Sequence, residues 1–276
     1  MTKTLCRSVA LLLVAAVLPA CPRKEDDDDA PALPPADTMT FFELKEGARS
    51  SEMTGQALTL AAPGDTSNVK LAVTAVGLVT AGVHLALLWP RTFIAGVVST
   101  RPTQDGDAWV WKRTFPLLGW DATLRGSVAS GRLATEMRVT GLKPDNSSYQ
   151  SFLWYTGDHG TRDGKWTVFA QGQTGPVLTI DWARQAADDK QLTFTNVTTA
   201  QDGSGDRLGY SIKGKIASMA IHDAKDASGQ PADSSVVWHV ENGAGKITAP
   251  TATLCWDTLA NGQVNIPCPA GDWPTP

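Results

Sequence analysis

Residues 123–139, TLRGSVASGRLATEMRV, carry the pattern that decides the fold of this chain. On each side of Ser130-Gly131, apolar or small residues recur at every second position, and mostly polar or charged residues fill the positions between them. A period of two is typical of a β-strand with one buried face, and a serine–glycine pair suits a tight turn. The stretch therefore predicts an antiparallel β-hairpin.

The same cadence continues toward the C-terminus. Short strand-like runs alternate with segments rich in Gly, Asp, Asn and Ser, which tolerate tight-turn geometry. The runs are SFLWYT, KWTVFAQ, PVLTIDW, QLTFTNV, RLGYSIK, KIASMAIH, SVVWHVE and TATLCWD. Roughly a dozen short strands with short connections predict a mainly β domain, an antiparallel meander that forms an open or half β-barrel.

One apolar segment departs from this alternation of strand-like runs and turns. Residues 71–89, LAVTAVGLVTAGVHLALLW, contain no formal charge, and Pro90 follows them. We expect one or two apolar helices over about residues 67–99, packed on the concave face of the sheet, with a cap in residues 65–68 and a break or kink at Pro90. Two alternatives remain open for residues 71–89, namely buried strands and insertion into a membrane, because the segment approaches the length of a bilayer span.

The N-terminus has the pattern of an export signal. Lys3 and Arg7 precede an apolar run too short to cross a bilayer, and the sequence LPAC ends at Cys21. This sequence resembles the lipobox of bacterial lipoproteins, and the resemblance implies lipidation of Cys21 and a place in the outer membrane through that anchor. An ordinary signal peptide with an incidental cysteine is the alternative.

The residues after Cys21 are acidic and rich in proline. Such a composition stays solvated and extended, so it predicts a tether that holds a folded domain away from the membrane surface. We therefore expect a lipoprotein signal peptide over residues 1–20, the lipidated cysteine and tether over 21–38, and a single β-rich domain over 39–276.

Composition and motifs limit the possible functions. The apolar content of 42% and charged content of 19% are those of a globular chain, and the net charge of −4 without a basic patch argues against a nucleic-acid partner. We expect no cofactor, metal or enzymatic activity, because the four histidines lack metal-ligand spacing and no nucleophile elbow is present. A hydrolase with Asp158 and Asp181 as its carboxylates, or with a triad drawn from distant strands, is the weaker alternative.

Two cysteines remain in the expected domain, Cys255 and Cys268. In an oxidising compartment such a pair predicts a disulfide. A metal or redox site is the alternative, although there is neither a C-x-x-C spacing nor a histidine close by.

Tryptophan is unusually frequent, with 10 residues against 3 Tyr and 7 Phe. We expect Trp109, Trp111, Trp154 and Trp238 to be candidates for the lining of a ligand cavity. Core packing and pairing between strands is the simpler explanation of the same residues.

Several local signatures resemble those of an uncharacterised family of bacterial lipoproteins. They are WVW at 109–111, FLWYTG at 152–157, IDW at 180–182, WHVENGAG at 238–245, and CWD at 255–257 followed by Cys268. The expected arrangement, a curved sheet with apolar helices in its hollow, is similar to the LolA/LolB half-barrel type, whose members carry lipids or lipoproteins between envelope membranes. The resemblance to the lipoprotein family implies fold and envelope location only, because that family has no assigned activity, whereas the similarity to the LolA/LolB type implies binding of a hydrophobic ligand such as a lipid. Together with the absence of catalytic motifs, we expect a lipid-anchored, non-enzymatic envelope protein that binds such a ligand. The alternative is a structural lipoprotein with a filled core that binds a protein or glycan partner.

Overall fold

A computed structural model of the chain describes residues 30–34, 66–116, 119–141, 151–186, 188–198, 203–226, 228–259, 262–271 and 273–274. The chain divides into two compact units, Met1–Ala30 and Pro31–Pro276, and the second contains every helix and strand below. The predicted signal peptide, Cys21 and most of the predicted tether lie outside the described residues.

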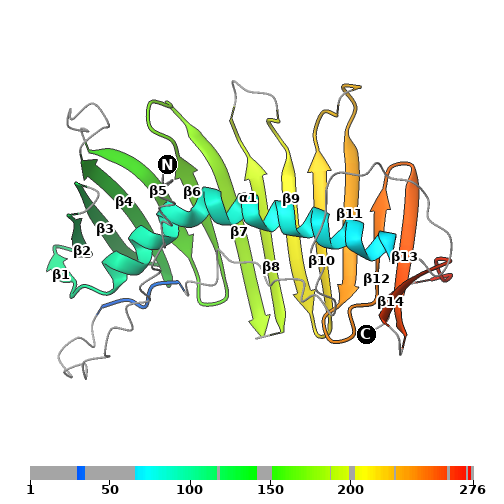
Figure 1. The fold of residues 1–276 in the computed structure, drawn as a ribbon. Helices are drawn as coiled ribbons and strands as arrows, with labels where there is room; N and C mark the ends of the chain where they lie inside the picture. Colours follow the sequence, from blue (N-terminus) through cyan, green and yellow to red (C-terminus); the bar gives the residue numbers. More distant parts are fainter. Residues whose placement is uncertain are drawn as a thin grey trace, which may run out of the picture. The chain divides into compact units, whose positions relative to one another are not determined.

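Fourteen strands form one sheet in which each strand pairs antiparallel with the next along the chain (Figure 1). They are β1 Thr103–Asp105, β2 Ala108–Phe115, β3 Trp120–Ala129, β4 Arg132–Gly141, β5 Phe152–His159, β6 Asp163–Phe169, β7 Pro176–Ala186, β8 Asp189–Asn196, β9 Arg207–Lys213, β10 Ile216–Asp223, β11 Ala232–His239, β12 Gly245–Ala249, β13 Ala252–Leu259 and β14 Gly262–Ile266. The order runs from β1 to β14 without closing on itself. The predicted open antiparallel meander is therefore confirmed.

The hairpin that the sequence predicts is the pair β3 and β4, in register from Trp120 opposite Gly141 to Ala129 opposite Arg132. Ser130 and Gly131 both have positive φ, 52° and 75°. This backbone suits the two-residue turn of a twisted hairpin, and glycine adopts it without steric cost.

One face of the sheet, here called the inner face, is lined by buried side chains. Leu124, Met137, Tyr155 and Val168 lie opposite one another across four successive strands and are all buried. The residues between them along each strand point to the other face, here called the outer face, because side chains alternate along a strand.

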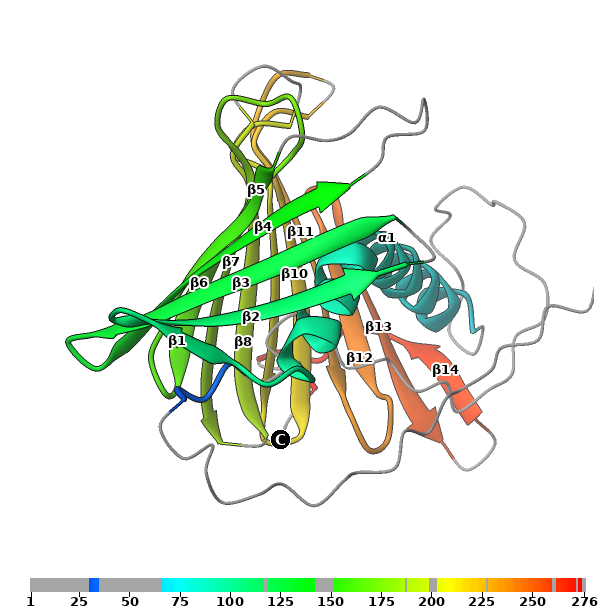
Figure 2. The same ribbon diagram turned by 90° about the vertical axis from the view of Figure 1, so that its left-hand side faces the viewer.

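The helix α1, Ser67–Val98, packs on the inner face and crosses the strands (Figure 1). Seen from the side, the sheet curves around it (Figure 2). It contacts β12, β13 and β14 near one edge of the sheet and β2 and β3 near the other. Residues 71–89 are thus helical rather than strands, and no helix in the described ranges is long and apolar enough to cross a membrane.

Pro90 does not end the helix, which continues as one element to Val98. A proline costs one backbone hydrogen bond, but tertiary packing can hold the following turns in place. Here Ile94 and Val97 are buried. A Cβ at Gly96 would lie 2.6 Å from the ring of Phe115, so the glycine allows this end of α1 to approach β2 closely.

Candidate ligand-binding site

A cavity of about 450 Å³ lies between the first half of α1 and the inner face of β10–β13. Most of its lining is aliphatic: Leu71, Ala75 and Val76 from the helix, and Met219, Ile221, Ser234, Ser235, Val236, Ile247, Ala249, Thr251, Ala252 and Leu254 from the sheet. This volume is within the range of small-molecule sites. Met219 and Val236 are buried at its base, whereas Ile221 is 37% exposed, so the cavity reaches the surface.

The lining contains no ionisable side chain. The polar groups are the hydroxyls of Ser234, Ser235 and Thr251. Burial of an unpaired charge in such surroundings is unfavourable, so the cavity suits uncharged, apolar groups. The hydroxyls are the groups of the lining that can form hydrogen bonds with a polar atom.

The start of α1 is fixed to the sheet beside this cavity. Asn68 donates its side-chain amide to the carbonyl of Cys255 at 3.0 Å, and its backbone N–H donates to Oδ1 of Asn265 at 3.0 Å. Asn265 in turn donates to Oγ of Ser67. Thr66, at the N-cap position, makes no capping bond with its side chain. Asn68, in the first turn of α1, therefore serves as a tertiary anchor rather than as the predicted cap.

The disulfide that the sequence predicts is present between Cys255 and Cys268, with Cα atoms 5.1 Å apart. Cys255 belongs to β13 and is buried, and its carbonyl is the acceptor of the Asn68 bond. The cross-link thus stabilises the strand to which α1 is anchored.

The four candidate tryptophans lie apart from the aliphatic cavity. Trp111 and Trp238 are buried, and Trp238 packs against Tyr210 with ring centroids 6.4 Å apart. Trp109 is half-buried on β2. Trp154 lies at an irregularity in the pairing of β4 and β5 and packs edge-on against Trp120 at 5.8 Å.

The residues that do line the cavity are small and aliphatic, and the sequence pattern did not single them out. Ala249 and Ala252, for example, face each other across β12 and β13 and leave space that larger side chains would fill. Their signal in the sequence is weak, because alanine in a strand reads as an ordinary small residue.

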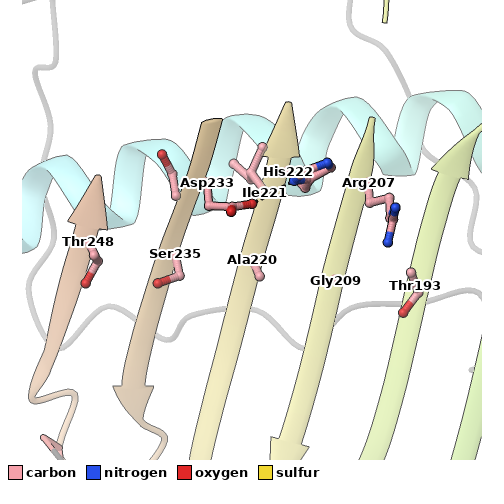
Figure 3. Close-up of a pocket in the computed structure, with 10 residues that line it drawn as sticks. Thr193, Arg207, Gly209, Ala220, Ile221, His222, Asp233, Ser235 and Thr248 are labelled. Carbon is pink, nitrogen blue, oxygen red and sulfur yellow. Dashed lines mark hydrogen bonds and ion pairs between the residues drawn. The ribbon is translucent and has the colours of Figure 1, made fainter. Parts of the chain in front are cut away.

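A second cavity, of about 360 Å³, lies on the outer face of β8–β12 (Figure 3). Gly209 and Ala220 are directly opposite each other and form its floor. The other outer-face residues of its lining are Thr193, Arg207, His222, Asp233, Ser235 and Thr248. We call this cavity the outer groove.

Across the top of the outer groove, Nδ1 of His222 lies 2.7 Å from Oδ1 of Asp233. A carboxylate can only accept, so Nδ1–H is the donor and Nε2 is left for another partner. Figure 3 shows the ring of His222 between Asp233 and the strand that carries Arg207.

A third feature is a polar cluster on the inner face around His159. The ring of His159 packs against Trp166 with centroids 4.1 Å apart, and Trp182 donates its indole N–H to Nδ1 at 3.3 Å. A Cβ at Gly164 would lie 2.6 Å from that same Nδ1, so glycine is needed for the ring to fit. Burial lowers the pKa of His159 to about 4, an effect that the nearby Asp158 partly opposes.

Three polar atoms of this cluster are buried without a hydrogen-bond partner in the described part of the chain: Nε2 of His159, Oγ1 of Thr135 and Nε1 of Trp166. Such groups are rare in folded proteins because their desolvation is not compensated. The inner face therefore carries buried polar groups here among its apolar side chains, and burial favours the neutral form of His159.

The carboxylates weighed for hydrolysis are engaged in surface ion pairs. Arg132 donates to Asp158 at 2.7 Å, and Nζ of Lys165 lies 3.2 Å from Asp181. Within the ranges that the structure describes, no group of three or more His, Cys, Asp or Glu side chains is placed to hold a metal ion.

Comparison with known proteins adds no further identification. No family model, no curated protein and no solved structure matches the chain.

Proposed function

We propose that this protein is a lipid-anchored component of the cell envelope that binds a hydrophobic ligand, such as a lipid acyl chain, between α1 and β10–β13. The observation that carries the proposal is the cavity of about 450 Å³, whose lining is largely aliphatic and holds no ionisable group. Burial of hydrocarbon there is favourable by about 25 cal/mol for each Å² removed from water. No chemistry is required of the protein beyond this burial.

The position of α1 fits this role. The helix forms one wall of the cavity with Leu71 and Val76, and its first turn is anchored by Asn68. Leu78 lies seven residues after Leu71, on the same side of the helix, and is 70% exposed, so α1 offers further apolar surface on that side. A hydrocarbon chain longer than the cavity would find further apolar contact there.

The alternative, a structural lipoprotein with a filled core, has support of its own. The inner face of the central strands is filled by large buried side chains, among them Tyr155, Ile180 and Leu192. This role requires that the aliphatic cavity be empty of ligand in the cell. The two roles therefore differ in one measurable property, the presence of bound lipid.

Lipid extraction of the purified full chain, followed by mass spectrometry, tests the proposal. Organic solvent removes non-covalent lipid and leaves a thioether-linked anchor on the protein, so the two are separated. Ala252→Phe would fill the inner cavity, and Ala220→Phe, which places the same ring on the outer face, is its control. We expect extractable lipid from the parent chain and from Ala220→Phe, and several-fold less from Ala252→Phe. Equal amounts from both variants, or none from the parent, would contradict ligand binding.

The anchor needs a separate measurement. Intact-mass analysis of the mature polypeptide should find a chain that begins at Cys21 and carries a diacylglycerol thioether. An unmodified N-terminus elsewhere would remove the envelope anchor from the proposal and leave the cavity to be judged by extraction alone.

A further inference from the structure

We infer that the outer groove is a second binding site, which takes a small acidic sugar, that is, a hydroxylated ring bearing one carboxylate or phosphate. This inference does not depend on a ligand in the aliphatic cavity, because the two cavities lie on opposite faces of the sheet and only the outer groove is lined by ionisable side chains. It rests on the charge, the hydroxyl groups and the floor of the outer groove.

The first observation is the positive charge of Arg207 in the outer groove. Arg207 is exposed at the start of β9, and no carboxylate of the described residues forms an ion pair with it. Asp233, the nearest acid of the lining, is instead paired with His222. A guanidinium presents parallel N–H donors that match carboxylate or phosphate oxygens, so the groove offers one binding position for a compact anion.

The second observation is the set of hydroxyl groups that line the outer groove. Thr193 lies on one side of the floor and Ser235 and Thr248 on the other (Figure 3). Each hydroxyl both donates and accepts, as does the hydroxyl of a sugar, and Nε2 of His222 adds a further partner. A fatty acid would leave these groups unsatisfied, whereas a hydroxylated ring would pair with them.

The floor decides the shape of the ligand. Gly209 and Ala220 face each other across β9 and β10, and a Cβ at Gly209 would meet only ordinary contacts, at 3.7 Å from Cβ of Ala220. The backbone is therefore exposed over two strands between taller neighbours. A flat, small ring can lie on this floor while its anionic group reaches Arg207.

Calorimetric titration of the full chain with four probes tests the inference. The probes are D-glucuronate, D-glucose 6-phosphate, D-glucose and inorganic phosphate. We expect at least one of the two acidic sugars to bind saturably, and the neutral sugar and the bare anion to bind at least about tenfold more weakly, since each lacks half of the recognised groups. The two acidic sugars distinguish a carboxylate ligand from a phosphate ligand.

Variants identify the site. Arg207→Gln should weaken binding of the acidic sugar about tenfold, because it removes the charge-assisted hydrogen bonds. Lys213→Gln removes a charge from the same face of the same strand, outside the groove, and should leave affinity within about twofold. Gly209→Val should block the floor and abolish binding, although valine suits a strand and allows folding.

Three results would overturn the inference. They are no saturable binding of either acidic sugar, inorganic phosphate binding as tightly as D-glucose 6-phosphate, and equal loss of affinity in Arg207→Gln and Lys213→Gln.

Discussion

The two faces of β10 and β11 differ in their ionisable groups although adjacent residues build them: the outer groove holds His222 and Asp233, and the aliphatic cavity holds no ionisable side chain. Met219 and Val236 line the aliphatic cavity beneath α1, and their neighbours Ala220 and Ser235 lie in the outer groove, Ser235 also reaching the rim of the cavity. The difference shows how a single layer of strands can serve two sites, since the period of two sends alternate side chains to opposite faces. The apolar face is the one that α1 covers.

A charge placed on each face gives the largest expected contrast. Met219→Asp would bury an unpaired carboxylate and should lower the free energy of unfolding by roughly 3–5 kcal/mol. Ala220→Asp, one residue along and exposed, should change it by no more than about 0.5 kcal/mol. Urea unfolding of both variants measures the difference. Similar losses would show that the outer face is also covered.

Acid should lower the stability of the fold through His159 on the inner face. Its pKa is lowered from 6.5 to about 4, so between these pH values the unfolded chain binds a proton that the folded chain does not. Stability is therefore complete above pH 6.5 and falls as the pH drops toward 4, by about 3 kcal/mol in total.

Urea unfolding at several pH values, with His159→Gln as the comparison, measures this contribution. The variant starts less stable but should lack this part of the acid sensitivity, because an amide does not titrate. Identical pH profiles for the two proteins would show that other groups cause the loss.

Removal of the disulfide should affect the aliphatic cavity more than the outer groove. It closes a loop of 13 residues in sequence, so Cys268→Ala should reduce stability by about 3 kcal/mol. Lipid recovery should fall with it, because β13 lines the inner cavity, whereas binding in the outer groove should persist at low temperature. A reductant should lower the stability of the parent chain by the same amount and leave the stability of Cys268→Ala unchanged. A further loss of stability in that variant would contradict this account.

The smallest effect is expected at the anchor of α1. Asn68→Ala removes one buried hydrogen bond to the carbonyl of Cys255 and should cost about 1–2 kcal/mol. Thr74→Ala on the same helix loses an exposed bond to the carbonyl of Lys70 and should be near neutral. Thermal unfolding and lipid extraction compare the two. A larger loss in Thr74→Ala would mean that the anchor does not hold the helix.

Much of the fold could be predicted from local pattern. The hairpin of β3 and β4, the strand-rich meander, the apolar helix and the Cys255–Cys268 bridge all follow from period, turn residues and cysteine count. The continuation of α1 through Pro90 could not be predicted, because it depends on the packing of Ile94 and Val97 against distant strands. The aliphatic lining of the cavity could not be predicted, and the four tryptophans expected as candidates for a cavity lining lie outside it.

The sequence by itself determined which residues alternate, where the chain turns and which segment is too apolar to stay in water, since these depend on neighbours along the chain. Only the tertiary structure decided which face α1 covers, that Leu71 and Leu254 line the same cavity, and that Arg207, His222 and Asp233 from three strands share one groove. Cavities arise where side chains far apart in sequence fail to fill the space between them, so a local sequence pattern cannot predict them.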